Sequence, residues 1–170
     1  MAETHWTLSW KDRPSEEAAL FNPAFCGELI YRGVSEYEGT RGTAMPLALA
    51  FVILPLTLHP PTRALLPGRA NATLVTWAAE QGPNTAELPD RVLALRPIAR
   101  EAILFMIQNG ALAVAPAGLQ RGEAPLKLSA KRPTATTETE DVRRAANLLG
   151  RWFANQGGAA PVLQALGVRP

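Results

Sequence analysis

Proline is the feature that most constrains this chain, because 15 prolines are spread along its 170 residues. A proline lacks the amide hydrogen that a helix donates, and its ring clashes with the preceding helical turn. We therefore expect short, kinked or capped helices. Aromatic residues make up only 6% of the chain, so Ala, Leu, Val and Ile must fill most of the core.

The longest apolar stretch runs from Met45 to Leu58 and contains Pro55. It has about fourteen residues, whereas a helix that spans a membrane needs about 20. The sequence therefore predicts a buried core helix over 45–59 and no membrane span. Cys26 is the only cysteine, which excludes an intrachain disulfide, and the first residues do not resemble a signal peptide. A cytoplasmic protein is the simplest expectation.

A single domain is expected over residues 1–170, because a chain of this length buries about 70% of its unfolded surface on folding. Helix starts are predicted at Ser15 and at Asn22-Pro23, where a polar cap precedes a proline. Thr139 is predicted to begin the last long helix. The expected organisation is an N-terminal extension, a helical, winged-helix-like core, a linker-like loop and C-terminal helices, at residues 1–13, 14–128, 129–139 and 140–170.

Residues 73–128 predict three helical segments followed by a hairpin. Thr73 is expected to cap the first segment, and Arg96-Pro97 separates the second from a third over 98–108. Leu119 to Leu128 is the predicted returning strand. This order is that of a winged helix-turn-helix, so the predicted fold class is mainly α with a small β-hairpin, with further helices at both ends of a winged-helix-like core. An irregular helical bundle with an incidental hairpin fits the pattern equally well.

No group of residues predicts a catalytic or metal centre. A zinc site needs about four ligands at short spacings, and His5, His59 and Cys26 show no such spacing. A Cys26–His59 dyad stays formally open, but Cys26 beside Phe25 is better explained as a small buried hydrophobe. His59 fits a positive charge at the C-terminus of the apolar helix. Because phosphate-binding, dinucleotide-binding and esterase motifs are also absent, we expect no enzyme activity, metal or cofactor.

The second half of the chain is basic, since residues 91–170 carry 11 basic and 5 acidic side chains. Candidate contacts to DNA phosphates lie in the predicted hairpin and linker; they are Arg121, Lys127, Lys131 and Arg132. The helix over 98–108 would have to read base edges, yet it is mostly apolar. It is better suited to a core or a protein interface, so direct DNA binding by a winged helix is the alternative hypothesis.

Several segments, in order, carry a resemblance to a known family. They are Asn22-Pro23-Ala24-Phe25-Cys26, Met45-Pro46-Leu47, Leu54-Pro55-Leu56-Thr57-Leu58-His59 with Pro61-Thr62-Arg63, Arg100-Glu101-Ala102-Ile103-Leu104-Phe105, Leu149-Gly150-Arg151-Trp152-Phe153-Ala154 and Leu166-Gly167-Val168-Arg169-Pro170. From about residue 14 onward the chain resembles the middle component of bacterial three-component ABC systems (ABC-3C, Lamassu-like), which act in antiphage defence.

The resemblance implies a non-enzymatic adaptor subunit that links an ABC ATPase of the SMC/Rad50 type to an effector such as a nuclease. DNA would then be sensed through the assembled complex, and no membrane or cofactor is implied. If the shared motifs mark contacts with partners, the interface includes Phe25, Arg63, Arg151, Trp152 and Arg169.

Overall fold

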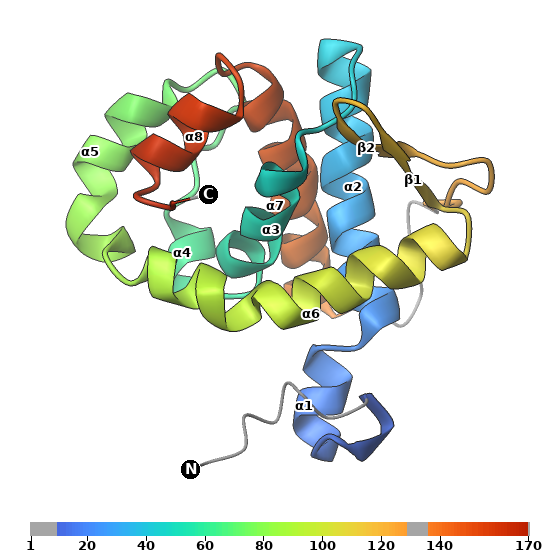
Figure 1. Ribbon diagram of the computed structural model, residues 1–170. Helices are drawn as coiled ribbons and strands as arrows, with labels where there is room; N and C mark the ends of the chain where they lie inside the picture. The colour runs from blue at the N-terminus through green and yellow to red at the C-terminus, as the bar shows by residue number, and fades with distance from the viewer. Residues whose placement is uncertain (1–9, 129–135, 170) are drawn as a thin grey trace.

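The computed structural model describes residues 10–128 and 136–169, apart from a few side chains. It confirms a mainly helical fold with one small antiparallel hairpin (Figure 1). After a short 3-10 helix, Trp10–Asp12, the elements are α1 (Ser15–Leu20), α2 (Pro23–Arg41), α3 (Leu47–Thr57), α4 (Pro60–Ala64), α5 (Leu74–Thr85), α6 (Leu88–Gln108), β1 (Leu112–Ala115), β2 (Gly118–Arg121), α7 (Thr137–Ala154) and α8 (Ala159–Ala165).

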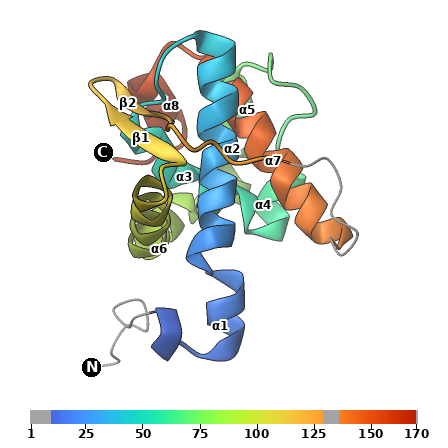
Figure 2. The ribbon, with the colours of Figure 1, turned by 90° about the vertical axis from the view of Figure 1, so that its right-hand side faces the viewer.

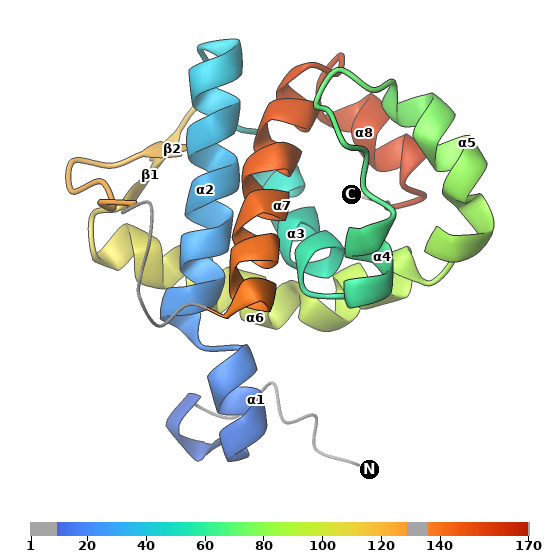
Figure 3. The same ribbon diagram turned by 180° about the vertical axis from the view of Figure 1, so that it is seen from behind.

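Helix α3 lies in the middle of the molecule and is buried almost all around, as the apolar stretch predicts. Helices α2 and α7 stand side by side on one flank of α3, and α6 crosses beneath it (Figure 3). Helices α5 and α8 close the opposite end. Because α2, α6, α7 and α8 all contact α3, nearly every one of its side chains can be apolar without facing water.

The contact between α2 and α7 is close because of a glycine. A Cβ atom on Gly150 would collide with the carbonyl oxygen of Gly33 and would lie 2.8 Å from Cβ of Glu36. The absence of a side chain at Gly150 therefore lets the backbones of the two helices approach each other directly. This gives a structural role to the Leu149–Ala154 motif.

Proline divides the chain less than the sequence predicts. Asn22-Pro23 begins α2 as expected, and Oδ1 of Asn22 accepts a hydrogen bond from the amide of Ala24 at 2.8 Å. The expected break at Arg96-Pro97 is wrong, since Pro97 lies inside α6. Pro97 and Leu93, whose carbonyl loses its helical donor, both lie on the exposed face. Water can bond that carbonyl, while the opposite face of α6 packs into the core on both sides of the proline.

The hairpin is shorter than predicted and is attached to the start of α3. Strands β1 and β2 pair from Leu112 with Arg121 to Ala115 with Gly118. The backbone of Leu119 also exchanges two hydrogen bonds of 2.8 Å with Met45. A Cβ atom on Gly118, which has a φ of 142°, would collide with the carbonyl of Met45. With α5 and α6 as two long helices before the hairpin, a winged-helix core is not confirmed.

His59 begins a helix instead of ending one. Helix α3 ends at Thr57, and His59 is the N-cap of α4. Its Nδ1 accepts a hydrogen bond from the amide of Thr62 at 3.3 Å and lies 2.7 Å from Oγ1 of Thr62. Arg91 donates to the same hydroxyl at 3.0 Å. A positive charge on His59 is therefore unfavourable here, and the predicted role at a helix C-terminus is wrong.

Helix α1 extends away from the rest of the molecule (Figure 2). Arg13, just before it, forms an ion pair of 2.6 Å with Glu101 on α6. At the other end of the chain, Thr136 caps α7 by accepting a hydrogen bond from the amide of Thr139. The last long helix therefore begins two residues earlier than predicted, at Thr137.

Candidate interaction surface

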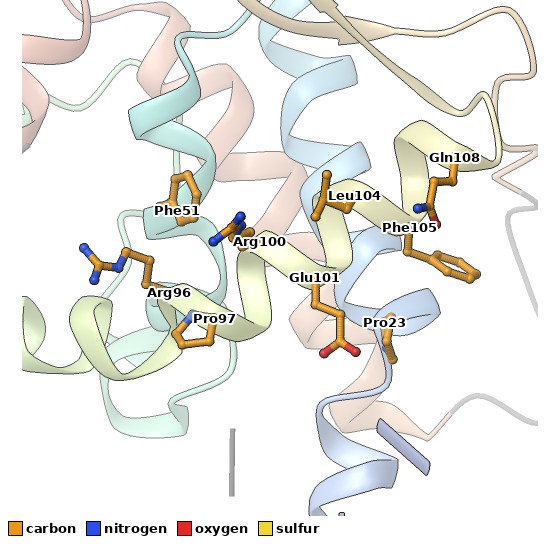
Figure 4. Close-up of a pocket in the computed structure, with 9 residues that line it drawn as sticks. All are labelled: Pro23, Phe51, Arg96, Pro97, Arg100, Glu101, Leu104, Phe105 and Gln108. Atoms are coloured by element: carbon orange, nitrogen blue, oxygen red, sulfur yellow. The ribbon is translucent and has the colours of Figure 1, made fainter. Parts of the chain in front are cut away.

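One side of α6 changes from basic to apolar along its length. Arg96, Arg100 and Leu104 follow one another at intervals of four residues, which places them on the same helical face. Both arginines are exposed, Leu104 is 47% exposed and the neighbouring Phe105 is 37% exposed. Figure 4 shows Arg100 and Leu104 on this face, with Phe51 of α3 beside Arg100. Large apolar side chains therefore reach solvent next to two cations.

The start of α3 and the hairpin form the other wall of a groove. Leu47 is 48% exposed on α3 and Val114 is 72% exposed on β1. Together with α6 they enclose a hollow of about 670 Å³. A second hollow of about 730 Å³ follows α6 towards its N-terminus. The two hollows share Phe51, Arg100 and Leu104 as lining residues, so we treat them as one surface, the α3–α6–hairpin groove.

The groove is positively charged at the end nearer the start of α6. No salt bridge involves Arg96 or Arg100 within residues 10–128 and 136–169. Glu101 lies close to them in sequence, but its carboxylate is already paired with Arg13 at 2.6 Å. The groove therefore presents two guanidinium groups with no carboxylate of the described residues bound to them.

The residues predicted as partner contacts are not brought together. Trp152 is fully buried and donates a hydrogen bond from its indole nitrogen to the carbonyl of Ala72 at 2.7 Å. Its ring packs edge-on against that of Trp77, with a centroid distance of 5.2 Å. Trp152 therefore belongs to the core and offers no surface for a partner. Phe25 is half-buried at a separate hollow, which Lys127 also lines.

The three predicted arginines lie at different places. Arg63 donates to the carbonyl of Thr57 at 2.6 Å and to Glu138 at 3.3 Å, so it fixes the chain between α3 and α4. Arg151 forms a salt bridge of 2.9 Å with Glu36 across α7 and α2. Only Arg169 is exposed without a hydrogen bond or ion pair to another described residue.

Two of the four predicted phosphate contacts, Arg121 and Lys127, lie in the part of the chain that the structure describes. Arg121 pairs with Glu38 at 3.2 Å, and its amide also donates to that carboxylate at 3.0 Å. Lys127 is exposed in the segment that follows the hairpin. Lys131 and Arg132 lie outside the described residues.

Cys26 and His59, which the sequence leaves open as a dyad, contact different residues in the fold. Burial raises the pKa of Cys26 to about 12, with a smaller contribution from Glu101. Burial also lowers the pKa of His59, and the charge of Arg91 lowers it further. The hydrogen bonds of His59 go to Thr62, whereas Sγ of Cys26 lies 3.7 Å from the carbonyl of Leu20. A thiol of this pKa stays protonated at neutral pH and is a poor nucleophile.

Within residues 10–128 and 136–169, no group of three or more His, Cys, Asp and Glu residues is arranged to hold a metal ion. No helix in these ranges is both long enough and apolar enough to cross a membrane.

Comparison with known families identifies the chain. A family model described as ABC-three component (ABC-3C) system Middle Component 3 matches residues 10–170. The chain belongs to this family. The resemblance drawn from the ordered motifs is thereby confirmed for nearly the whole of this middle component. No curated protein and no solved structure matches the chain.

The groove of the middle component is not predicted by the sequence, although Arg100 to Phe105 form one of the ordered motifs. The sequence predicts that the apolar run from Ala102 to Ile107 is suited to a core or an interface, and the structure divides it between the core and the exposed surface. Ile103 and Met106 face the core, whereas Leu104 and Phe105 reach solvent. The available signal is a helix that has apolar residues on every face and also carries Arg96 and Arg100.

Proposed function

We propose that this middle component is a non-catalytic adaptor, which links the ABC ATPase of its system to an effector subunit in a cytoplasmic antiphage defence complex. Membership of the family supports partners among the other components of an ABC-3C system. The ATPase would be of the SMC/Rad50 type, and the effector an enzyme such as a nuclease. Contact with DNA would be made through the complex.

The observation that carries this proposal is the α3–α6–hairpin groove. Leu47, Leu104 and Val114 are each about half exposed or more, and they come from three elements that meet at one surface. A monomeric protein seldom leaves several large apolar side chains together in water, and such patches commonly mark binding sites for other proteins. The groove therefore supports a role exercised by contact.

The state of the reactive side chains supports the non-catalytic part of the proposal. Cys26 is fully buried with a raised pKa, and His59 uses its Nδ1 as a helix cap. Glu28 is held by two arginines, with distances of 2.7 Å to Arg143 and 2.9 Å to Arg32. Each of these groups already has a structural partner or lies away from solvent.

Co-purification with the other components tests the proposal. The middle component is co-expressed with the ABC ATPase and the effector encoded beside it, and the mixture is separated by size exclusion. We expect a stable complex that Leu104→Asp disrupts, because a carboxylate would be placed in the apolar part of the groove. Val75→Asp is the matched control, since Val75 is 62% exposed on α5, away from the groove. Components that elute separately at micromolar concentration would refute the adaptor role.

Direct DNA binding is the second candidate. It is favoured by Arg96 and Arg100, which are exposed and form no salt bridge with the residues that the structure describes, on a helix that precedes a hairpin. Binding through phosphates must weaken steeply as salt rises. A labelled duplex titrated with the isolated protein at low salt tests it, and the absence of binding would exclude this candidate.

A further inference from the structure

We infer, on the basis of the proposed adaptor function, that the α3–α6–hairpin groove holds an amphipathic α-helix of another component of the system. Acidic side chains near one end of that helix would face Arg96 and Arg100. Its apolar side chains would enter the hollow between α6, α3 and the hairpin.

The charges of the groove indicate where its occupant carries acidic side chains. Arg96 and Arg100 are exposed at one end, where no described residue forms a salt bridge with them, and the carboxylate of Glu101, which follows Arg100 on α6, is bound by Arg13. A guanidinium group binds a carboxylate through two parallel hydrogen bonds, and such pairs strengthen when water is excluded. A partner segment with carboxylates at this end would therefore complement the groove, whereas a basic segment would be repelled.

The apolar end determines the spacing of the occupant's hydrophobic residues. Leu104, Leu47 and Val114 come from the three walls and line the same hollow. A helix that lies in such a groove presents apolar residues at positions i, i+3 or i+4, and i+7. This pattern allows one face of the occupant to contact all three walls while its opposite face stays in water.

The length of the groove indicates that the bound helix has about three turns. Arg96 and Gln108 mark the ends of the lined part of α6. The twelve residue steps between them correspond to about 18 Å at about 1.5 Å per residue. The chain's own α1 carries Glu16, Glu17 and Leu20, but its six residues span only about 9 Å. A second copy that inserted α1 would leave much of the groove open.

The wall formed by the hairpin is built before any partner binds. The two hydrogen bonds between Met45 and Leu119 join β2 to the start of α3, and Gly118 allows this close approach. Leu47 and Val114 are therefore held on connected parts of the fold. A preformed groove avoids the entropy loss of ordering loops upon binding, which favours association with a helix.

A charge-conserving substitution makes the occupant identifiable. In the Arg96→Lys/Arg100→Lys variant, both cations become primary amines, which a carbodiimide couples directly to carboxylates in contact with them. The variant is assembled with the other components, treated with the carbodiimide, digested and analysed by mass spectrometry. Arg69→Lys is the matched control, because Arg69 is exposed outside the groove. Reversal of both charges in Arg96→Glu/Arg100→Glu should weaken assembly by roughly tenfold or more.

The outcomes separate this inference from the adaptor function. Cross-links from positions 96 and 100 to Asp or Glu in an amphipathic helical segment of another component would support it. Cross-links to α1 of a second copy, or an intact complex with no more cross-linking than the Arg69→Lys control, would overturn it while leaving the adaptor function standing. Failure of the wild-type components to assemble would refute the adaptor function itself, and with it the inference.

Discussion

Substitution of Gly150 by alanine tests the close contact between α2 and α7. The added Cβ atom would collide with the carbonyl oxygen of Gly33 and would lie 2.8 Å from Cβ of Glu36 and 3.0 Å from the carbonyl carbon of Gly33. These atoms belong to the backbone or are attached directly to it, so no flexible side chain can turn aside. The two helices must separate, or both must bend.

The expected size of the effect follows from two opposing contributions. Alanine in place of glycine inside a helix stabilises it by about 1 kcal/mol. Overpacking a rigid contact destabilises a core by about 1–3 kcal/mol, and we take the upper end here because the opposing atoms cannot rotate away. Gly150→Ala should therefore lower the free energy of unfolding by about 2 kcal/mol, which corresponds to a Tm lower by about 4–8 °C.

The matched control is Gly39→Ala on α2, where a Cβ atom would meet nothing within 4 Å. Helix propensity alone should then act, raising the free energy of unfolding by about 0.5–1 kcal/mol. Both variants are compared with the wild type by urea unfolding followed by circular dichroism. A Gly150→Ala protein as stable as Gly39→Ala would show that α2 and α7 do not approach each other as described.

Three further predictions concern titratable groups. Because the folded protein lowers the pKa of His59, its contribution to stability is complete above about pH 6.5 and is lost as pH falls. His59→Asn, which still caps α4 without titrating, should weaken the decline of Tm between about pH 7 and 5. Cys26 should not react with a thiol reagent at pH 8 until denaturant is added; rapid labelling of the native protein would contradict its burial. Although burial raises the pKa of Glu28, hydrogen bonds from Arg143 and Arg32 lower it overall. Glu28→Gln should therefore destabilise the protein by about 1–3 kcal/mol in urea unfolding at pH 7, and a difference that persists unchanged below pH 4.5 would contradict the charge-based explanation.

Much of the fold follows from local signals in the sequence. Asn22-Pro23 marks the start of α2 because its cap and its missing amide hydrogen act within one turn. The stretch from Met45 to Leu58 is buried because no face of it is polar. The sequence predicts that the helix breaks at Pro97, but α6 continues through it. The effect of a proline on a helix depends on whether the freed carbonyl can reach water, and that depends on packing. The sequence indicates the wrong helix end for His59 for a related reason, because only two residues separate the end of α3 from the start of α4.

The candidate surface is harder to predict from the sequence than the fold. Helix α6 has apolar residues on all its faces, so the sequence shows that some of them must be exposed or covered by a partner, but not which. The choice is made by α2 and α3, which cover Ala102 and Met106 and leave Leu104 and Phe105 outside. Trp152 was equally ambiguous, because a tryptophan beside an arginine is common both in cores and in interfaces.

The pairing of α2 with α7 also affects the order in which parts of the protein can fold. The two helices are separated by about one hundred residues of chain, yet their contact is among the most extensive in the molecule. Contacts between distant segments form late, since a long loop must close first. While the chain is being synthesised, α3 therefore lacks one of its covers until α7 emerges from the ribosome.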